Sequence, residues 1–191
     1  MDKNLIFELY KDKRTVFSLQ EIALLLDESN FARLKQRIHY YVRTKKLKNP
    51  RRGIYAKENY SREELACKIY LPAYISMEYV LQKAGIIFQY YQYMTIISYL
   101  SRNIHVEGYS YSYRKIKNDV LINTTGIIRN NAGINIATSE RALLDTLYLN
   151  KEYYFDSLKS LNKEVVINMI PIYKSVSLKK KVYKLFENAG Y

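Results

Sequence analysis

The sequence predicts an α+β protein of two domains, in which a small basic helical domain precedes a larger domain of helices and strands. Three observations predict this arrangement. Apolar residues recur at helical spacing through the first 46 residues. Stretches rich in Ile, Val, Thr and Tyr, which favour strands, are concentrated between residues 92 and 128. Residues 1–57 hold 14 Lys and Arg against 6 Asp and Glu, a net charge of +8 out of +13 for the chain.

The composition is that of a folded chain, with 48% hydrophobic and 26% charged residues, and its excess of positive charge points to a polyanionic partner. The single cysteine, Cys67, excludes an intramolecular disulfide framework and fits a reducing compartment. Charges flank the short apolar patch of the N-terminus, which is not the pattern of a secretory signal. No window approaches the roughly 18–20 apolar residues that a membrane helix needs. We therefore expect a cytoplasmic protein.

The first two helices are expected at 2–11 and 19–26. Leu5, Ile6 and Leu9 share one side of the first helix, and four apolar residues form one stripe of the second. Ser18 precedes Glu21 by three positions, which is the spacing of a capping box at a helix start.

A third, basic helix is expected at 30–46, capped by Ser29 or Asn30. At 100° per residue, one face carries the apolar residues Phe31, Leu34, Ile38, Tyr41 and Val42. The opposite face carries Arg33, Gln36, Arg37, Tyr40 and Arg43. A solvated helix face is the alternative interpretation, but such faces usually mix both signs of charge, and no Asp or Glu occurs between Glu28 and Glu58.

Pro50 and Gly53 predict a basic hairpin directly after this helix, with its tip at 49–52 and a returning strand at 53–56. Taken alone, the hairpin could be a generic β-turn with a charged tip. Beside a basic helix it is typical of a wing. Residues 1–57 are therefore predicted to form a winged helix-turn-helix domain.

Residues 58–62 are expected to be a linker, and residues 63–191 a C-terminal α+β domain with a small antiparallel sheet and several helices. Helices are expected at 63–71, 77–84 (capped by Ser76), 140–149 (starting at Thr138 or Ser139), 155–161 and 178–188. Strands are expected at 94–100, 105–113, 120–125 and 134–137. The apolar segment 163–172 fits a helix or a strand equally well.

The assembled pattern resembles the AbiEi family, the antitoxins of bacterial type IV, or abortive-infection, toxin–antitoxin systems. Three stretches carry the resemblance. The first is FSLQEIALLL with the returning strand RRGIYA at residues 51–56; the others are AYISMEYVLQKAGII at 73–87 and NIATSERALLDTLYL at 135–149. Their order and spacing hold over roughly residues 3–150, and the last 40 residues match only as generic helices.

The resemblance implies an N-terminal DNA-binding domain that represses its own operon by binding inverted repeats in the promoter. It also implies a C-terminal domain that counters a nucleotidyltransferase toxin encoded nearby, without a stable complex between the two proteins. We further expect no membrane partner, and a chain that can be a monomer in solution and bind DNA as two copies.

The residues offer little for catalysis, so we expect no enzyme, no cofactor and no metal. Two histidines, His39 and His105, and one cysteine cannot build a usual structural zinc site. The six glycines include no phosphate-cradling set. Glu107 and Asp119 lie near predicted strands but lack the closely following Lys of a metal-dependent nuclease. Glu140, Arg141 and Asp145 are interpreted as structural, with Arg141 and Asp145 paired at i,i+4.

The candidate site is therefore a DNA-binding surface on the third helix and the hairpin. Arg and Gln side chains, with their forked donors and acceptors, suit the edges of bases. The remaining Lys and Arg side chains of this surface suit phosphates. Base readers are expected to be Arg33, Gln36, Arg37 and Tyr40. Phosphate contacts are expected from Lys35, Arg43, Lys45, Lys46, Arg51 and Arg52, with Asn30 and Lys48 on the same surface.

Two other partners remain open at this point. The basic surface could dock on an acidic protein, as in an antitoxin that neutralises its toxin by direct contact. An RNA-binding regulator is the third possibility, although a helix with a hairpin suits a duplex groove better than splayed single strands.

Overall fold

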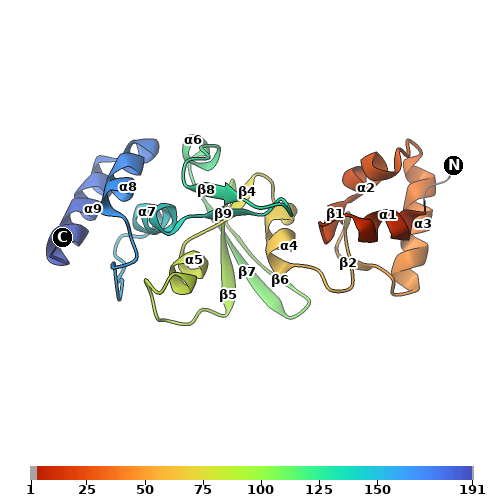
Figure 1. The fold of residues 1–191 in the computed structure, drawn as a ribbon, viewed down its shortest axis with the longest axis horizontal. Helices are drawn as coiled ribbons and strands as arrows, with labels where there is room; N and C mark the ends of the chain where they lie inside the picture. Colours follow the sequence, from red (N-terminus) through yellow and green to blue (C-terminus); the bar gives the residue numbers. More distant parts are fainter. Residues whose placement is uncertain (1–3, 191) are drawn as a thin grey trace. The chain divides into compact units, whose positions relative to one another are not determined.

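The computed structural model describes residues 4–190, and its chain divides into two compact units (Figure 1). The N-terminal unit reaches to Ile69 and also includes Asn130–Ile134. The C-terminal unit comprises Tyr70–Arg129 and the chain from Asn135 onward. The fold is mixed α+β, and each unit has its own sheet.

The N-terminal unit combines helices with a three-stranded antiparallel sheet of order β1-β3-β2. Its elements are α1 (Leu5–Lys11), β1 (Val16–Ser18), α2 (Leu19–Leu26), α3 (Phe31–Arg43), β2 (Lys48–Arg51), β3 (Ile54–Ala56) and α4 (Arg62–Ile69). One cluster of buried residues joins the first three helices to the sheet: Leu5, Leu9, Phe17, Ile22, Ala23, Leu26, Leu34, Ile38, Leu47 and Tyr55.

The predicted start of α2 is confirmed. The Ser18 hydroxyl accepts from the Glu21 amide at 3.2 Å, and the Glu21 carboxylate accepts from the Ser18 amide at 2.7 Å. The helix spans the expected residues, 19–26. The predicted helix at 2–11 is present from Leu5, and its first two positions lie outside the described residues.

The hairpin is also present, but it belongs to a sheet that the sequence analysis did not predict in full. β1 is only three residues long and pairs with β3, so that the returning strand lies in the middle of the sheet. Gly53, at φ +79°, forms the turn between β2 and β3 in a left-handed backbone conformation that glycine adopts without strain.

The N-terminal unit extends beyond the linker expected at 58–62, because α4 is fastened to it by polar side chains. The Glu64 carboxylate accepts from the Thr15 amide at 2.6 Å and from the Val16 amide at 2.8 Å. The Lys68 ammonium donates to Glu21 at 2.5 Å. These bonds hold α4 against β1 and α2, so the compact unit runs to Ile69 rather than ending at residue 57.

The C-terminal unit contains a six-stranded mixed sheet rather than the small antiparallel sheet expected. The strand order is β6-β7-β5-β4-β9-β8, with the pairs β5·β7 and β4·β9 parallel. The strands are β4 (Ala73–Ile75), β5 (Tyr93–Ser98), β6 (Arg102–Val106), β7 (Tyr109–Lys115), β8 (Ile127–Arg129) and β9 (Asn135–Ala137). The helices are α5 (Glu78–Lys83), α6 (Asn118–Leu121), α7 (Ser139–Leu149), α8 (Lys163–Met169), the 3-10 helix η1 (Ile170–Tyr173) and α9 (Val176–Asn188).

The strand predicted at 105–113 is two strands, β6 and β7, joined by a tight turn. Glu107 and Gly108 both have positive φ, at +47° and +83°. Two such residues in succession form the kind of turn that matches the twist of a two-residue hairpin. Val106 and Tyr109 pair directly across it.

Two predicted elements of this unit are wrong. Segment 120–125, predicted as a strand, is the end of a short helical turn followed by a loop. Two of its carbonyls accept hydrogen bonds from a buried arginine instead of from a neighbouring strand. The Arg141 guanidinium donates to the Val120 carbonyl at 2.7 Å and to the Thr125 carbonyl at 2.9 Å. Segment 155–161 is not a helix, since the amides of Asp156 and Ser157 donate to the Ile86 carbonyl.

The predicted cap of α5 is wrong as well. The residue at the cap position is Met77, at φ +54°, and it makes no capping hydrogen bond with its side chain. The Ser76 hydroxyl instead donates to the Asp145 carboxylate at 2.7 Å. The undecided segment 163–172 is helical, as α8 and η1.

A buried ion pair lies at the centre of this unit. The Arg141 Nε and Asp145 Oδ1 atoms are 3.5 Å apart, which confirms the pairing that the i,i+4 spacing predicted, and both side chains are fully buried. The hydroxyls of Tyr74 and Tyr173 donate to Asp145 at 3.2 and 2.6 Å. Burial beside this carboxylate raises the pKa of Tyr173 well above its ordinary value, so the hydroxyl remains a donor at neutral pH.

Within residues 4–190, no helix is long and apolar enough to cross a membrane.

Replacing Asp145 by Asn is expected to destabilise the C-terminal unit by about 3–5 kcal/mol, because Arg141 would keep its charge in a buried site without a counter-charge. Hydrogen exchange of the α7 amides measures the loss. Glu152→Gln, at an exposed acid just beyond α7, is the matched control and should change exchange little. Equal protection in the Asp145→Asn and Glu152→Gln variants would show that the pair does not hold this unit together.

Candidate nucleic-acid interface

Two apolar side chains fix the rotation of α3 in the N-terminal unit. Leu34 and Ile38 are fully buried in the core cluster, and Tyr41 and Val42 pack against the same cluster partly buried. Phe31, expected on this side, is 45% exposed, because it lies at the first turn of the helix and beyond the edge of the core. The opposite face of α3 is therefore turned to solvent.

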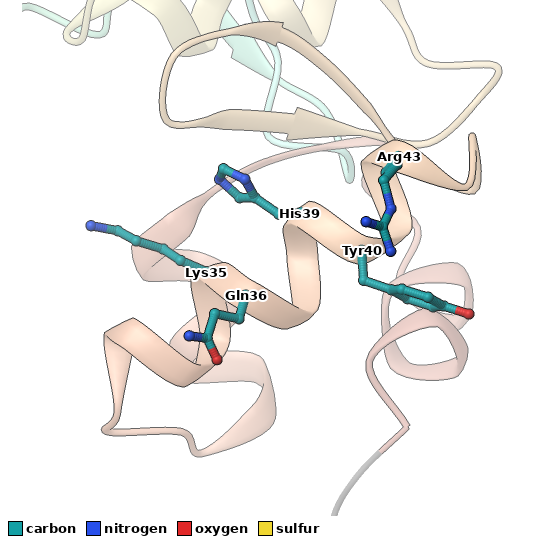
Figure 2. A pocket seen from close by; sticks show the side chains of 5 residues that line it. All are labelled: Lys35, Gln36, His39, Tyr40 and Arg43. Atoms are coloured by element: carbon teal, nitrogen blue, oxygen red, sulfur yellow. The ribbon is translucent and has the colours of Figure 1, made fainter.

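That exposed face forms a shallow hollow of about 570 Å³ (Figure 2). The side chains that line it come from successive turns of the helix: Lys35, Gln36, His39, Tyr40 and Arg43. All are exposed, and none is acidic. The hollow thus combines cationic groups with an amide, an imidazole and a phenol, which can donate and accept hydrogen bonds.

Aromatic contacts hold the end of this face in place. The Arg43 guanidinium carbon lies 6.0 Å from the centre of the Tyr40 ring, at the outer limit of a cation–π contact. The Tyr40 ring meets the ring of Tyr41 edge-on, with 5.3 Å between their centres. Since Tyr41 packs against the core, these ring contacts connect the exposed side chains of Tyr40 and Arg43 to a residue that the core supports.

Arg33 and Arg37, both predicted base readers, lie outside the hollow. Arg33 is exposed on the first turns of α3, whereas Arg37 is half-buried on the flank. An Arg37 guanidinium nitrogen lies 3.8 Å from a carboxylate oxygen of Glu28, in the turn before α3. This ion pair engages Arg37 with the turn between α2 and α3, so Arg37 is placed less favourably for a ligand on the exposed face than Gln36 or Arg43.

Asn30 has a structural role at the start of the helix. Its side-chain oxygen accepts from the Arg33 amide at 3.0 Å, as an N-cap does. Of the two residues expected to cap α3, Asn30 is the one that does so. The same oxygen is therefore engaged with the protein and is less available to a ligand.

The remaining predicted cations lie after the helix. Lys45 and Lys46 are exposed in the turn that follows α3, and Arg52 is exposed at the hairpin turn. Arg51 is half-buried on β2. Lys48 is also half-buried, and its ammonium lies 5.5 Å from the centre of the Tyr60 ring.

His39 is the residue of this face that the sequence analysis left out of the site. In the structure it lies between Lys35 and Arg43 along the hollow (Figure 2). The signal was available, because residue 39 follows Lys35 by four positions and Gln36 by three, and so shares their side of a helix.

In the part of the chain that the structure describes, no three side chains of His, Cys, Asp and Glu lie close enough together to hold an ion.

Fold and surface define a two-unit α+β protein with an acid-free cationic face on one helix of its N-terminal unit. No protein-family model and no curated protein sequence matches the chain. Among solved structures, the chain is similar to the crystal structure of the RV2827C protein from Mycobacterium tuberculosis, with a TM-score of 0.58 at 13% identity. The similarity covers 97% of this chain and 76% of that one. At this identity it establishes a shared fold.

Asn30→Ala is expected to destabilise the first turn of α3 by about 1 kcal/mol, because the Arg33 amide loses its acceptor. Amide hydrogen exchange at residues 31–34 should accelerate, while exchange in α2 should not. Asn30→Asp, which keeps an acceptor oxygen at this position, is the control and should restore protection. Unchanged exchange in Asn30→Ala would mean that the cap contributes nothing to the helix.

Proposed function

We propose that this chain is a sequence-specific binder of double-stranded DNA, and that α3 is its recognition helix. The observation that carries the proposal is the face of Lys35, Gln36, His39, Tyr40 and Arg43, which is exposed, free of acids and fixed in orientation by Leu34 and Ile38. An α-helix with its side chains is about 10–12 Å wide, and the major groove of B-DNA is about 12 Å wide.

The order of side chains along α3 suits base recognition. Gln36 offers an amide that can pair with adenine, and the Arg43 guanidinium can pair with guanine or hold a phosphate. Lys35 and His39 extend the same surface toward the duplex backbone. Arg33 remains a candidate base reader on the first turns of the helix, and Arg37 becomes one only if it leaves Glu28.

The elements around α3 support a winged helix-turn-helix interpretation of the N-terminal unit. α2 and α3 are joined by a short turn, and the β2–β3 hairpin follows α3 directly. In this interpretation α2 braces the recognition helix. Lys45, Lys46 and Arg52, exposed after α3, would contact phosphates on either side of the groove.

We further propose the biological role that the AbiEi resemblance implies: an autorepressor that binds inverted repeats in its own promoter and serves as the antitoxin of a nucleotidyltransferase toxin. This part rests on the three sequence stretches that carry the resemblance. Repression of a reporter gene placed behind the native upstream region tests the regulatory half. A nucleotidyltransferase gene next to this one, whose toxicity the full chain relieves, tests the other half. If the two proteins copurify in high salt, direct neutralisation replaces the antitoxin mechanism proposed here.

Gln36→Ala and Arg43→Ala are each expected to cost about 1–3 kcal/mol of binding to the native promoter fragment if the contact is bidentate. The loss should fall on one base pair, so that substituting this pair weakens the native protein but not the variant. Fluorescence anisotropy against a set of single-pair variants of the promoter measures this. Promoter affinity unchanged by Gln36→Ala, Arg43→Ala and the double variant Arg33→Ala/Arg37→Ala would rule out this face of α3.

Lys46→Ala and Arg52→Ala are expected to weaken all DNA sequences alike, because phosphates carry no sequence information. Each substitution should also reduce the slope of log affinity against log salt concentration by about 0.9. Lys151→Ala, which removes an exposed cation from the C-terminal unit, is the matched control. An equal change of slope in the Lys151→Ala variant would indicate that only overall charge matters.

A further inference from the structure

A second surface, in the C-terminal unit, is not explained by DNA binding. It is a groove of about 380 Å³ between the α8–η1 segment and α9. Its lining is mostly apolar, with a few polar side chains, and includes Ile170, Pro171, Lys174, Val176, Lys179 and Tyr183.

α9 carries two stripes of side chains, and the fold uses only one of them. Leu178, Val182 and Phe186 recur at helical spacing and are buried. A second stripe, Val176, Lys179 and Tyr183, recurs three and four positions apart, which is also a helical spacing, and faces the groove. Val176 is 73% exposed and Tyr183 46% exposed, so this stripe leaves apolar surface in water.

Both charged side chains that line the groove are cations, and one of them is paired with an acid outside the lining. Lys174 and Lys179 belong to its lining, which contains no Asp or Glu. The Lys174 ammonium lies 2.9 Å from the Asp119 carboxylate, in a pair that is itself exposed. Lys180 and Lys184 are exposed on α9, and together they outnumber its single acid, Glu187.

We propose that this groove binds an amphipathic helix with an acidic polar face, presented by a partner protein. Apolar side chains on one face of such a helix would cover Val176 and Tyr183. Carboxylates beside them would meet Lys179 and would compete with the exposed Asp119 for Lys174. The charges select the partner and its orientation, while the apolar contact supplies most of the affinity. A second copy of this chain is a poor complement, because each copy has a net charge of +13.

The probe is a fluorescent peptide of about 18 residues with Leu on one helical face and Glu elsewhere, titrated against the full chain and followed by anisotropy. One control peptide has the same composition with the Leu residues scattered, and another has Lys in place of Glu. The test variant is Val176→Glu. Val165→Glu is the matched control, because Val165 is 40% exposed in the first turn of α8 and does not line the groove. An acid in the first turn of a helix is favourable, so both variants should fold.

The expected result is saturable binding of the acidic peptide, weakened by about tenfold or more in Val176→Glu and by less than about twofold in Val165→Glu. Both control peptides should bind more weakly, and hydrogen exchange should show new protection in α8, η1 and the start of α9. Promoter binding by Val176→Glu should equal that of the native chain, which separates this result from the DNA-binding proposal.

Several outcomes would overturn the proposal. These are the absence of saturable peptide binding, equal losses in Val176→Glu and Val165→Glu, or equal binding of the Lys-containing peptide. A chain that sediments as a dimer, and as a monomer after Val176→Glu, would assign the groove to a second copy instead. Binding to anionic lipid vesicles that Val176→Glu abolishes would assign it to a membrane surface.

Discussion

The burial of Leu34 and Ile38 is the constraint on which the candidate interface depends. Both side chains are fully buried, and they lie four positions apart on one side of a 13-residue helix. With the helix fixed at these two positions, its 100° periodicity sends Gln36 and Arg43 to the opposite side. The cationic face is therefore a consequence of core packing. The residues that fix it, Leu34 and Ile38, pack in a core cluster that lies within the N-terminal unit.

The sequence was sufficient wherever local chemistry decides the structure. The Ser18 and Glu21 capping box starts α2 at the predicted residue, and the apolar repeat of α3 predicts which side is buried. It was insufficient where a contact with residues outside the element itself determines the position of a side chain. Arg37 falls on the polar side of a helical wheel, yet it pairs with Glu28 because the chain turns sharply between α2 and α3. Periodicity alone cannot place an acid that lies outside the helix.

In the C-terminal unit, contacts between separate elements determine even more of the structure than in the N-terminal unit. Arg141 and Asp145 pair at the predicted i,i+4 spacing, but the sequence did not indicate that both are fully buried. Because the Arg141 guanidinium bonds the carbonyls of Val120 and Thr125, an apolar segment that predicts a strand becomes a turn and a loop. The order of the strands in the sheet could not be predicted from the sequence either, since the parallel pairs join strands that are not consecutive in the chain. Long-range hydrogen bonds, and not local propensity, determine this part of the fold.

The two surfaces differ in what they offer a partner. The α3 face is polar, cationic and only shallowly hollowed, and it is carried by a single exposed helix, as suits a duplex groove. The α8–α9 groove is apolar with a cationic rim, as suits a protein helix. The claim that the α3 face enters the duplex can be tested by photocrosslinking to the promoter fragment from a benzophenone side chain at position 36. Position 24, on α2 and 82% exposed, is the comparison. The account predicts crosslinks to DNA bases from position 36 and few or none from position 24. Equal crosslinking from both positions, or crosslinking from position 24 alone, would contradict it.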